Sequence, residues 1–204
     1  FYREGMRLYI NDFDANGRLE QLYAVPVGNE YFPVHDKDEL IKQLPGLKKK
    51  LLYYSDYAKA DIESIFGPEL LSSAASFELD QVESSVFLSS PNGYTRVALS
   101  DELQYSSVYT TTIDTAKSNN RLRVFLGGNQ YDFKPQYGAY DASTGWELEI
   151  ETKGDDVMQR VRPLGIDGAL RKLTVTYRGP RKDSLILIAA RNNKSIRSLY
   201  VKNE

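Results

Sequence analysis

Residues 122–129, with the sequence LRVFLGGN, form an apolar segment that ends in two glycines and an asparagine. The same form recurs at residues 22–29 (LYAVPVGN) and at residues 185–193 (LILIAARNN). Short apolar segments bounded by turn residues are typical of β-strands, and their recurrence along a chain indicates a repeat architecture. We therefore expect a mainly β fold built from repeated units.

Each of these strands is preceded by another apolar segment across a turn-rich connection, at residues 6–11, 108–113 and 173–177. A second kind of hairpin alternates with the first and joins residues 85–88 to 94–99 and residues 146–150 to 157–161. Two hairpins per unit make a four-stranded blade, so the pattern predicts a partial β-propeller of about two and a half to three antiparallel blades. The final strand, residues 196–201, has no return arm, and we expect it to be an exposed edge.

Residues 36–76 interrupt the strand pattern with helical spacing. Helices are expected at residues 36–44, which open with acidic residues, and at residues 55–66, which open with Ser55 and end before Gly67. This helical insertion is expected outside the sheet layers. The resulting division assigns the first hairpin to residues 1–35, the insertion to 36–76, the second hairpin of blade one to 77–105, blade two to 106–168 and an incomplete blade three to 169–204.

Composition limits the chemistry that the chain can carry. Its 204 residues include 26 Lys and Arg against 28 Asp and Glu, a net charge of −2, which argues against a nucleic-acid partner. The chain contains no cysteine and one histidine, His35, so thiolate zinc sites and multi-histidine metal sites are excluded. No apolar run reaches the length of a membrane-spanning helix, and we expect no membrane span in this chain.

The turn at residues 12–20, DFDANGRLE, places oxygen-bearing side chains at alternate positions around a glycine. This spacing suits calcium, for which the candidate ligands are the side chains of Asp12, Asp14, Asn16 and Glu20 and the carbonyl oxygen of Arg18. An EF-hand would need an acidic residue where Tyr23 stands, and strands rather than helices flank the loop. The alternative is a polar turn whose side chains bond only their own backbone.

A calcium loop between two strands resembles the FG-GAP repeat, also described as a VCBS-type repeat, of integrin-α-like β-propellers. The chain also resembles the C-terminal portion of large FG-GAP-like proteins of Bacteroidetes. The matching motifs are DKDELIKQLP (36–45), LKKK (47–50), DYA (56–58), IFG (65–67), GGNQY (127–131), PQYGAYDAS (135–143) and ARNN (190–193). The resemblance implies an exported protein at the extracellular or outer-membrane surface. Such proteins usually have about seven blades, more than this chain supplies.

Two departures from the family pattern set the expected number of sites. The last ligand of the loop is usually aspartate, whereas this chain has Glu20. The turn after Asp114 contains Lys117 and is followed by Arg121 and Arg123, and the turn at residues 178–183 carries three basic residues. We expect one calcium site, in the first hairpin.

Aromatic residues around a long connection form a second candidate site. They are Tyr131, Phe133, Tyr137, Tyr140 and Trp146, which can stack on a ligand such as a sugar or pack between blades. We interpret Glu147, Glu149 and Glu151 as a solvated strand face rather than, with Asp155 and Asp156, a glycosidase pair. His35 is expected to be a capping or surface residue, and residues 48–50 a solvated helix face.

These observations favour a non-enzymatic, calcium-stabilised binding or adhesion module of an exported bacterial surface protein. Its expected partners are missing propeller blades or other protein chains, including a second copy, and a glycan or surface protein as ligand. Two alternatives stay open, a carbohydrate-active propeller enzyme and a structural fragment of a larger propeller assembly. Catalytic residues that converge in the fold would favour the enzyme, and further blades elsewhere in the protein would favour the structural fragment.

Overall fold

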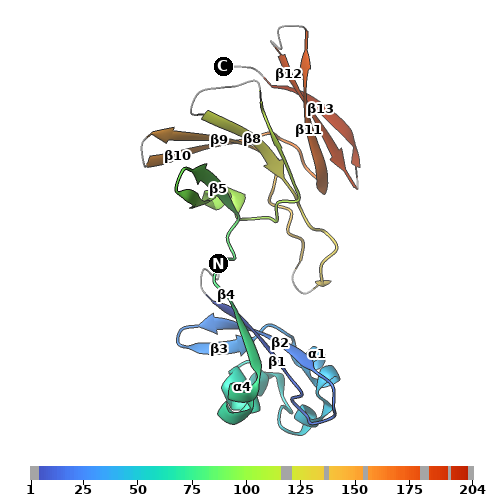
Figure 1. Cartoon of the computed structure of the whole chain (residues 1–204). Helices are drawn as coiled ribbons and strands as arrows, with labels where there is room; N and C mark the ends of the chain where they lie inside the picture. Colours follow the sequence, from blue (N-terminus) through green and yellow to red (C-terminus); the bar gives the residue numbers. More distant parts are fainter. Residues whose placement is uncertain are drawn as a thin grey trace. The chain divides into compact units, whose positions relative to one another are not determined.

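The computed structural model describes residues 5–115, 121–135, 138–153, 156–179, 184–192 and 194–201. The chain divides into two compact units, unit 1 (Phe1–Val82) and unit 2 (Glu83–Glu204). The fold is mainly β, with four antiparallel sheets across the two units (Figure 1). None of the helices among the described residues has the length and apolar content needed to cross a membrane.

Unit 1 contains a four-stranded sheet in the order β3-β2-β1-β4. Its strands are β1 (Met6–Asn11), β2 (Glu20–Val27), β3 (Glu30–Pro33) and β4 (Ala75–Leu79). The predicted hairpin of β1 and β2 is present, but its flanking partners are β3 and β4 rather than the predicted hairpin at residues 85–99. A two-residue turn explains β3, because Gly28 adopts a positive φ of 63° and returns the chain directly beside β2.

The helical segment of unit 1 lies between β3 and β4 in the chain. Its helices are α1 (Lys37–Gln43), η1 (Pro45–Lys49), α2 (Tyr54–Tyr57), α3 (Ile62–Phe66) and α4 (Pro68–Ser73). A capping box of Asp36 and Glu39 begins α1 as the acidic sequence predicted. The predicted helix at 55–66 is instead two short helices, because Asp61 caps a new start for α3. Gly67 ends α3, as predicted.

The helices pack against the sheet and form the core of unit 1 with it. Leu22 and Ala24 of β2 belong to one buried cluster with Leu40, Leu44 and Ile65 of the helical segment. The helices thus lie outside the sheet, as expected, but they are not a separate insertion, because they share the buried core with it. A single four-stranded sheet cannot bury its own apolar face, and the helices cover it.

Unit 2 contains three sheets. Strands β5 (Ser85–Ser90) and β6 (Gly93–Ala98) form a two-stranded sheet, followed by η2 (Asp101–Leu103). The second sheet has the order β10-β9-β8-β7 and contains β7 (Thr110–Ile113), β8 (Arg121–Gly127), β9 (Trp146–Lys153) and β10 (Asp156–Pro163). The third, in the order β11-β12-β13, contains β11 (Leu170–Arg178), β12 (Ser184–Arg191) and β13 (Lys194–Val201). The hairpin pairings predicted for these two sheets are confirmed, and β13 is an edge strand.

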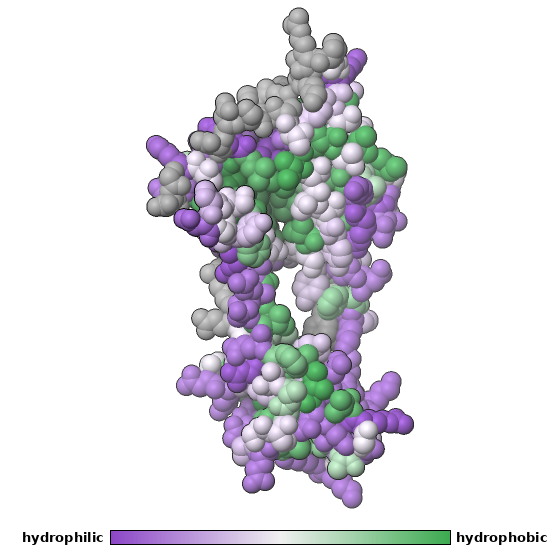
Figure 2. All heavy atoms as spheres, viewed as in Figure 1, coloured by the Kyte–Doolittle hydropathy of each residue, from purple (hydrophilic) through white to green (hydrophobic). Residues whose placement is uncertain are grey.

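The two faces of the β7–β10 sheet pack in different buried clusters. One face carries Leu126, Leu148 and Ile150, which form a buried cluster with Leu103. An apolar hollow of about 400 Å³ remains along this face, and Figure 2 shows hydrophobic residues gathered on the visible side of unit 2. Because side chains alternate along a strand, Phe125 points to the other face and joins the cluster of the β11–β13 sheet.

Candidate metal centre

The candidate calcium loop connects β1 to β2 and is folded by its own side chains. The carboxylate of Asp12 accepts hydrogen bonds from the backbone N–H groups of Asn16 (2.9 Å) and Gly17 (2.7 Å). The side-chain oxygen of Asn16 accepts one from the N–H of Arg18 at 2.8 Å. The bend needs a φ of 82° at Gly17, which glycine adopts without steric strain.

Two anchors hold this loop against the body of unit 1. Phe13 is buried, with its ring centroid 4.8 Å from that of Phe66 in α3. Asn11 donates through Nδ2 to the carbonyl oxygen of Leu70 and to the hydroxyl of Ser73, both in α4, at 3.3 and 3.1 Å. The loop is thus attached to the helical segment at its base while its tip is exposed.

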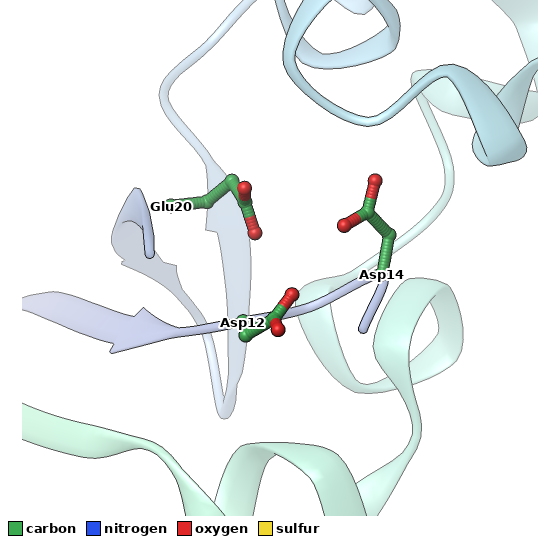
Figure 3. Close-up of side chains that lie close together, drawn as sticks. All are labelled: Asp12, Asp14 and Glu20. Atoms are coloured by element: carbon green, nitrogen blue, oxygen red, sulfur yellow. The ribbon is translucent and has the colours of Figure 1, made fainter. Parts of the chain in front are cut away.

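Three carboxylates converge above these anchors. Asp12, Asp14 and Glu20 each place one oxygen so that all three lie within 4.8 Å of one another, and Figure 3 shows them facing a common space. Calcium binds oxygen at about 2.3–2.6 Å, so two ligands of one ion are up to about 5 Å apart. The spacing of the three oxygens therefore fits one calcium ion.

The predicted ligands differ in how the structure places them. Asp14 is exposed, whereas Glu20 is buried, with its Oε2 accepting a hydrogen bond from the N–H of Phe13 at 3.0 Å. Asn16 directs its side-chain oxygen to the backbone of the loop, which is the bonding that the polar-turn alternative predicted. The carbonyl oxygen of Arg18 stays a predicted ligand. Three of the five predicted ligands are thus gathered by the fold.

The β7–β10 sheet contains a buried guanidinium, that of Arg123, between two carboxylates. Arg123 Nε donates to Glu147 Oε1 at 2.6 Å, and Nη1 lies 3.5 Å from Asp114 Oδ2. The hydroxyl of Tyr177 donates to Asp114 Oδ1 at 2.6 Å. The expectation that the glutamates form a solvated face is wrong for Glu147, which is 5% exposed, because Arg123 compensates its charge inside the fold.

Other charged candidates also have structural partners. Arg121 Nη2 lies 3.2 Å from Glu151 Oε2, and Glu149 is opposite Arg123 in the strand register. Residues 48–50 are exposed at the end of η1, as predicted, and Lys50 also donates to the carbonyl oxygens of Ser64 and Ile65 in α3 at 2.7 and 2.8 Å. Asp155 lies outside the described residues, whereas Asp156 begins β10.

His35 follows β3, near the start of the helical segment. Its backbone carbonyl accepts a hydrogen bond from the hydroxyl of Tyr57 at 2.5 Å. Its ring centroid lies 6.2 Å from that of Tyr23. These contacts place His35 beside two tyrosines, Tyr57 and Tyr23, and give it a structural role.

The aromatic candidates divide into two groups. Tyr131, Phe133 and Tyr140 are exposed, and the rings of Phe133 and Tyr140 meet edge to face at 4.9 Å between centroids. Trp146 instead packs against the buried cluster of the β7–β10 sheet, because its position in β9 faces that cluster. Tyr137 lies outside the described residues.

Two residues beside the exposed aromatic group, Tyr109 and Arg171, belong to none of the sites predicted from the sequence. Tyr109 donates from its hydroxyl to Gln130 Oε1 at 2.9 Å, and the guanidinium of Arg171 lies 4.1 Å from the centroid of the Tyr109 ring. Arg171 also donates to the carbonyl oxygen of Asn129 at 2.9 Å. These residues are distant in the chain, and no local motif connects them.

Comparisons with models of known protein families, with curated proteins and with solved structures found no significant match.

Proposed function

We propose that this chain is a non-enzymatic, calcium-stabilised β-sheet module that binds other molecules through its exposed surfaces. The observation that carries the proposal is the convergence of the Asp12, Asp14 and Glu20 oxygens within 4.8 Å on a loop with two structural anchors. Three carboxylates at this spacing repel one another, and a bound cation removes that repulsion. Binding to the folded state alone then stabilises the fold by mass action.

The donor set favours calcium over other biological cations. All three converging groups are carboxylates, which are hard oxygen ligands, and the chain has no cysteine to provide a soft one. Magnesium requires near-ideal octahedral geometry at about 2.0–2.1 Å, whereas calcium accepts irregular sets of six to eight oxygens. Water and backbone oxygens would complete the coordination around this exposed loop.

We further propose that two sheets of unit 2, β7–β10 and β11–β13, are blades of a β-propeller completed by other blades. The β7–β10 sheet supports this arrangement because it is a four-stranded antiparallel meander, as a blade is, and the β11–β13 sheet has three consecutive strands of the same pattern. In β13, Ile196 and Tyr200 are exposed along an open edge that a further strand can extend. The partners are then neighbouring blades or other chains.

The ion pairs of the acidic residues in unit 2 support a binding role rather than catalysis. Glu147 and Glu151 form ion pairs with arginines instead of facing each other across a substrate site. The exposed rings of Tyr131, Phe133 and Tyr140 support a glycan or a surface protein as ligand. Export to the bacterial surface and adhesion rest on the sequence resemblance to FG-GAP repeat proteins.

Calorimetric titration of the chelator-treated chain with calcium chloride tests the metal site. We expect one ion per chain with a dissociation constant on the order of 10⁻⁵ to 10⁻³ M, since the loop is exposed. Asp14→Asn should weaken binding at least tenfold, because it removes one charge at a side chain that does not fold the loop. Asp56→Asn, at an exposed aspartate of α2, is the matched control and should bind as the wild type does.

A titration without heat, together with a melting temperature that calcium does not raise, would contradict the site. Equal losses in Asp14→Asn and Asp56→Asn would also contradict it, because the effect would then be a general change of charge. In the wild type, calcium at a hundred times the dissociation constant should add about 2.7 kcal/mol to the free energy of unfolding.

A further inference from the structure

The sheet of unit 1 has two apolar faces, and the helical segment packs on one of them. On β1, Tyr9 faces the helices and is buried with them, so Met6, Leu8 and Ile10 face the opposite side. The register places Met6 opposite Leu79 and Leu8 opposite Phe77 of β4. Phe77 is 58% exposed and Leu79 is 47% exposed.

The same face continues across the other two strands. In β2, Leu22 and Ala24 are buried against the helices, whereas Tyr23 and Val25 alternate with them and point to the other side. Phe32 of β3 is directly opposite Val25 in the register. The outer face, as we name it, therefore presents apolar side chains from all four strands, centred on Leu8 and Tyr23, which are paired with each other.

The charges of these strands lie mostly on the helix side or at the margin. Arg7 and Glu78 form an ion pair at 3.5 Å and share the side of Tyr9 in the strand register, and Glu20 is on the same side in β2. Glu30 places a carboxylate on the outer face, but it lies opposite Val27 at one end of β3 and not at the centre. Two copies of the outer face can therefore meet without bringing like charges together at the centre.

The outer face has enough area for a weak dimer. Aromatic side chains bury about 150–250 Å² each, so Phe77 at its observed exposure leaves roughly 100 Å² open. With its neighbours, the face offers roughly 500–700 Å² per copy, or 1,000–1,400 Å² in total, which is the lower end of specific interfaces. Apolar sheet faces pack on one another about 10 Å apart in sandwiches.

We propose that the outer face of unit 1 binds the outer face of a second copy of this chain, sheet against sheet, around a two-fold axis. The same patch then serves both subunits, as an isologous interface requires. The dimer deepens the proposed binding role by naming a partner, and it uses neither the calcium ligands nor the aromatic group of unit 2. Its success or failure is therefore separate from that of the calcium site.

Sedimentation velocity of the full chain in calcium buffer, from about 1 to 200 μM, measures the dimer over the concentration range in which a weak interface assembles. The wild type should shift from monomer to dimer across this range. Phe77→Lys should raise the dissociation constant at least tenfold, because it places two charges in the apolar interface. Phe87→Lys is the matched control, since Phe87 is a phenylalanine of β5 that is 57% exposed.

Chemical crosslinking provides a second measurement that does not depend on a destabilising charge. The chain contains no cysteine, so a substituted one is unique. Tyr23→Cys lies near the proposed axis and should yield a crosslinked dimer with a short bismaleimide. Tyr94→Cys, on exposed β6, should not.

Three results would overturn the proposal. A wild type that stays monomeric across the range excludes the second copy and leaves the outer face to a different partner. If Phe77→Lys leaves the dimer intact, the dimer interface lies elsewhere on the chain. If Phe87→Lys weakens the dimer as much as Phe77→Lys does, the interface is not specific to the outer face. Circular dichroism of each variant verifies that its strand content matches the wild type.

Discussion

Asp61 begins α3 through its side chain, which accepts a hydrogen bond from the N–H of Ser64 at 2.8 Å. Interaction with the Ser64 side chain, followed by that backbone N–H, lowers the pKa of Asp61 from its ordinary value. The folded state thus holds the charged form more firmly than the unfolded chain does. The cap's stability is present above the unfolded pKa, about 3.9, and is lost as the pH falls through the lowered folded value.

Acid denaturation should therefore separate Asp61→Asn from the wild type. The asparagine still caps the helix but does not titrate, so its free energy of unfolding should fall less between pH 5 and pH 2.5. At pH 7, Asp61→Ala should lower the free energy of unfolding by about 1 kcal/mol through loss of the cap. Urea titrations at each pH measure both effects. Parallel pH curves for Asp61→Asn and the wild type would show that the carboxylate has no such role.

Arg123 is a buried cation with two buried carboxylates beside it. It lies between Asp114 and Glu147, and all three are at most 5% exposed. Arg123→Ala leaves the two carboxylates buried without the guanidinium, so the free energy of unfolding should fall by about 3–5 kcal/mol. Arg121→Ala removes an exposed pair with Glu151 on the same strand and should change it by less than about 1 kcal/mol.

Urea denaturation of both variants checks this difference. Similar small losses would mean that the buried guanidinium contributes no more than an exposed one.

At the scale of elements, the asparagines that follow the repeated strands differ in burial between one repeat and another. Asn129 is fully buried, and its amide donates to the carbonyl oxygens of Ser143 (2.8 Å) and Gly168 (3.0 Å). Its side-chain oxygen accepts from the N–H of Ser143 and the hydroxyl of Ser106, both at 3.0 Å. Asn129 thereby connects the end of β8 to three other segments of unit 2.

Asn29 follows β2 at the corresponding place of the first repeat, in an exposed turn. Asn129→Ala should lower the free energy of unfolding by about 3 kcal/mol or more, because several buried polar groups lose their partners at once. Asn29→Ala should change it by less than about 0.5 kcal/mol. Thermal and urea denaturation provide the comparison, and equal effects at the two positions would contradict the role assigned to Asn129.

At the scale of the whole molecule, each unit has its own buried core. Leu40 belongs to the cluster of unit 1, and Leu187 to a cluster of unit 2. Calorimetry of the full chain should therefore resolve two unfolding transitions. Leu40→Ala should lower the free energy of unfolding of unit 1, and Leu187→Ala that of unit 2. Each loss should be about 2–5 kcal/mol, as expected for fully buried leucines, and should lower the melting temperature of that unit's transition. A single transition that both substitutions shift would show that the units unfold together.

The sequence by itself determined the local features of this protein. The hairpins of β1 and β2, β7 and β8, and β11 and β12 follow from apolar segments beside turn residues, and the start of α1 follows from Asp36 and Glu39. The convergence of Asp12, Asp14 and Glu20 was also predictable, because one short loop holds all three. Such features depend on residues within a few positions of one another, and spacing is visible in the sequence.

Only the tertiary structure decided how the segments combine. The pairing of β4 with β1 joins residues more than sixty positions apart. Leu40 of the helical segment and Leu22 of β2 belong to one buried cluster, so the expected insertion is part of the core. The contacts of Arg123 with Glu147 and of Arg171 with Tyr109 also depend on strand register across the chain. The physical reason is that burial and long-range pairing are set by which surfaces meet, and an alternating pattern shows that a strand has two faces without showing what covers each.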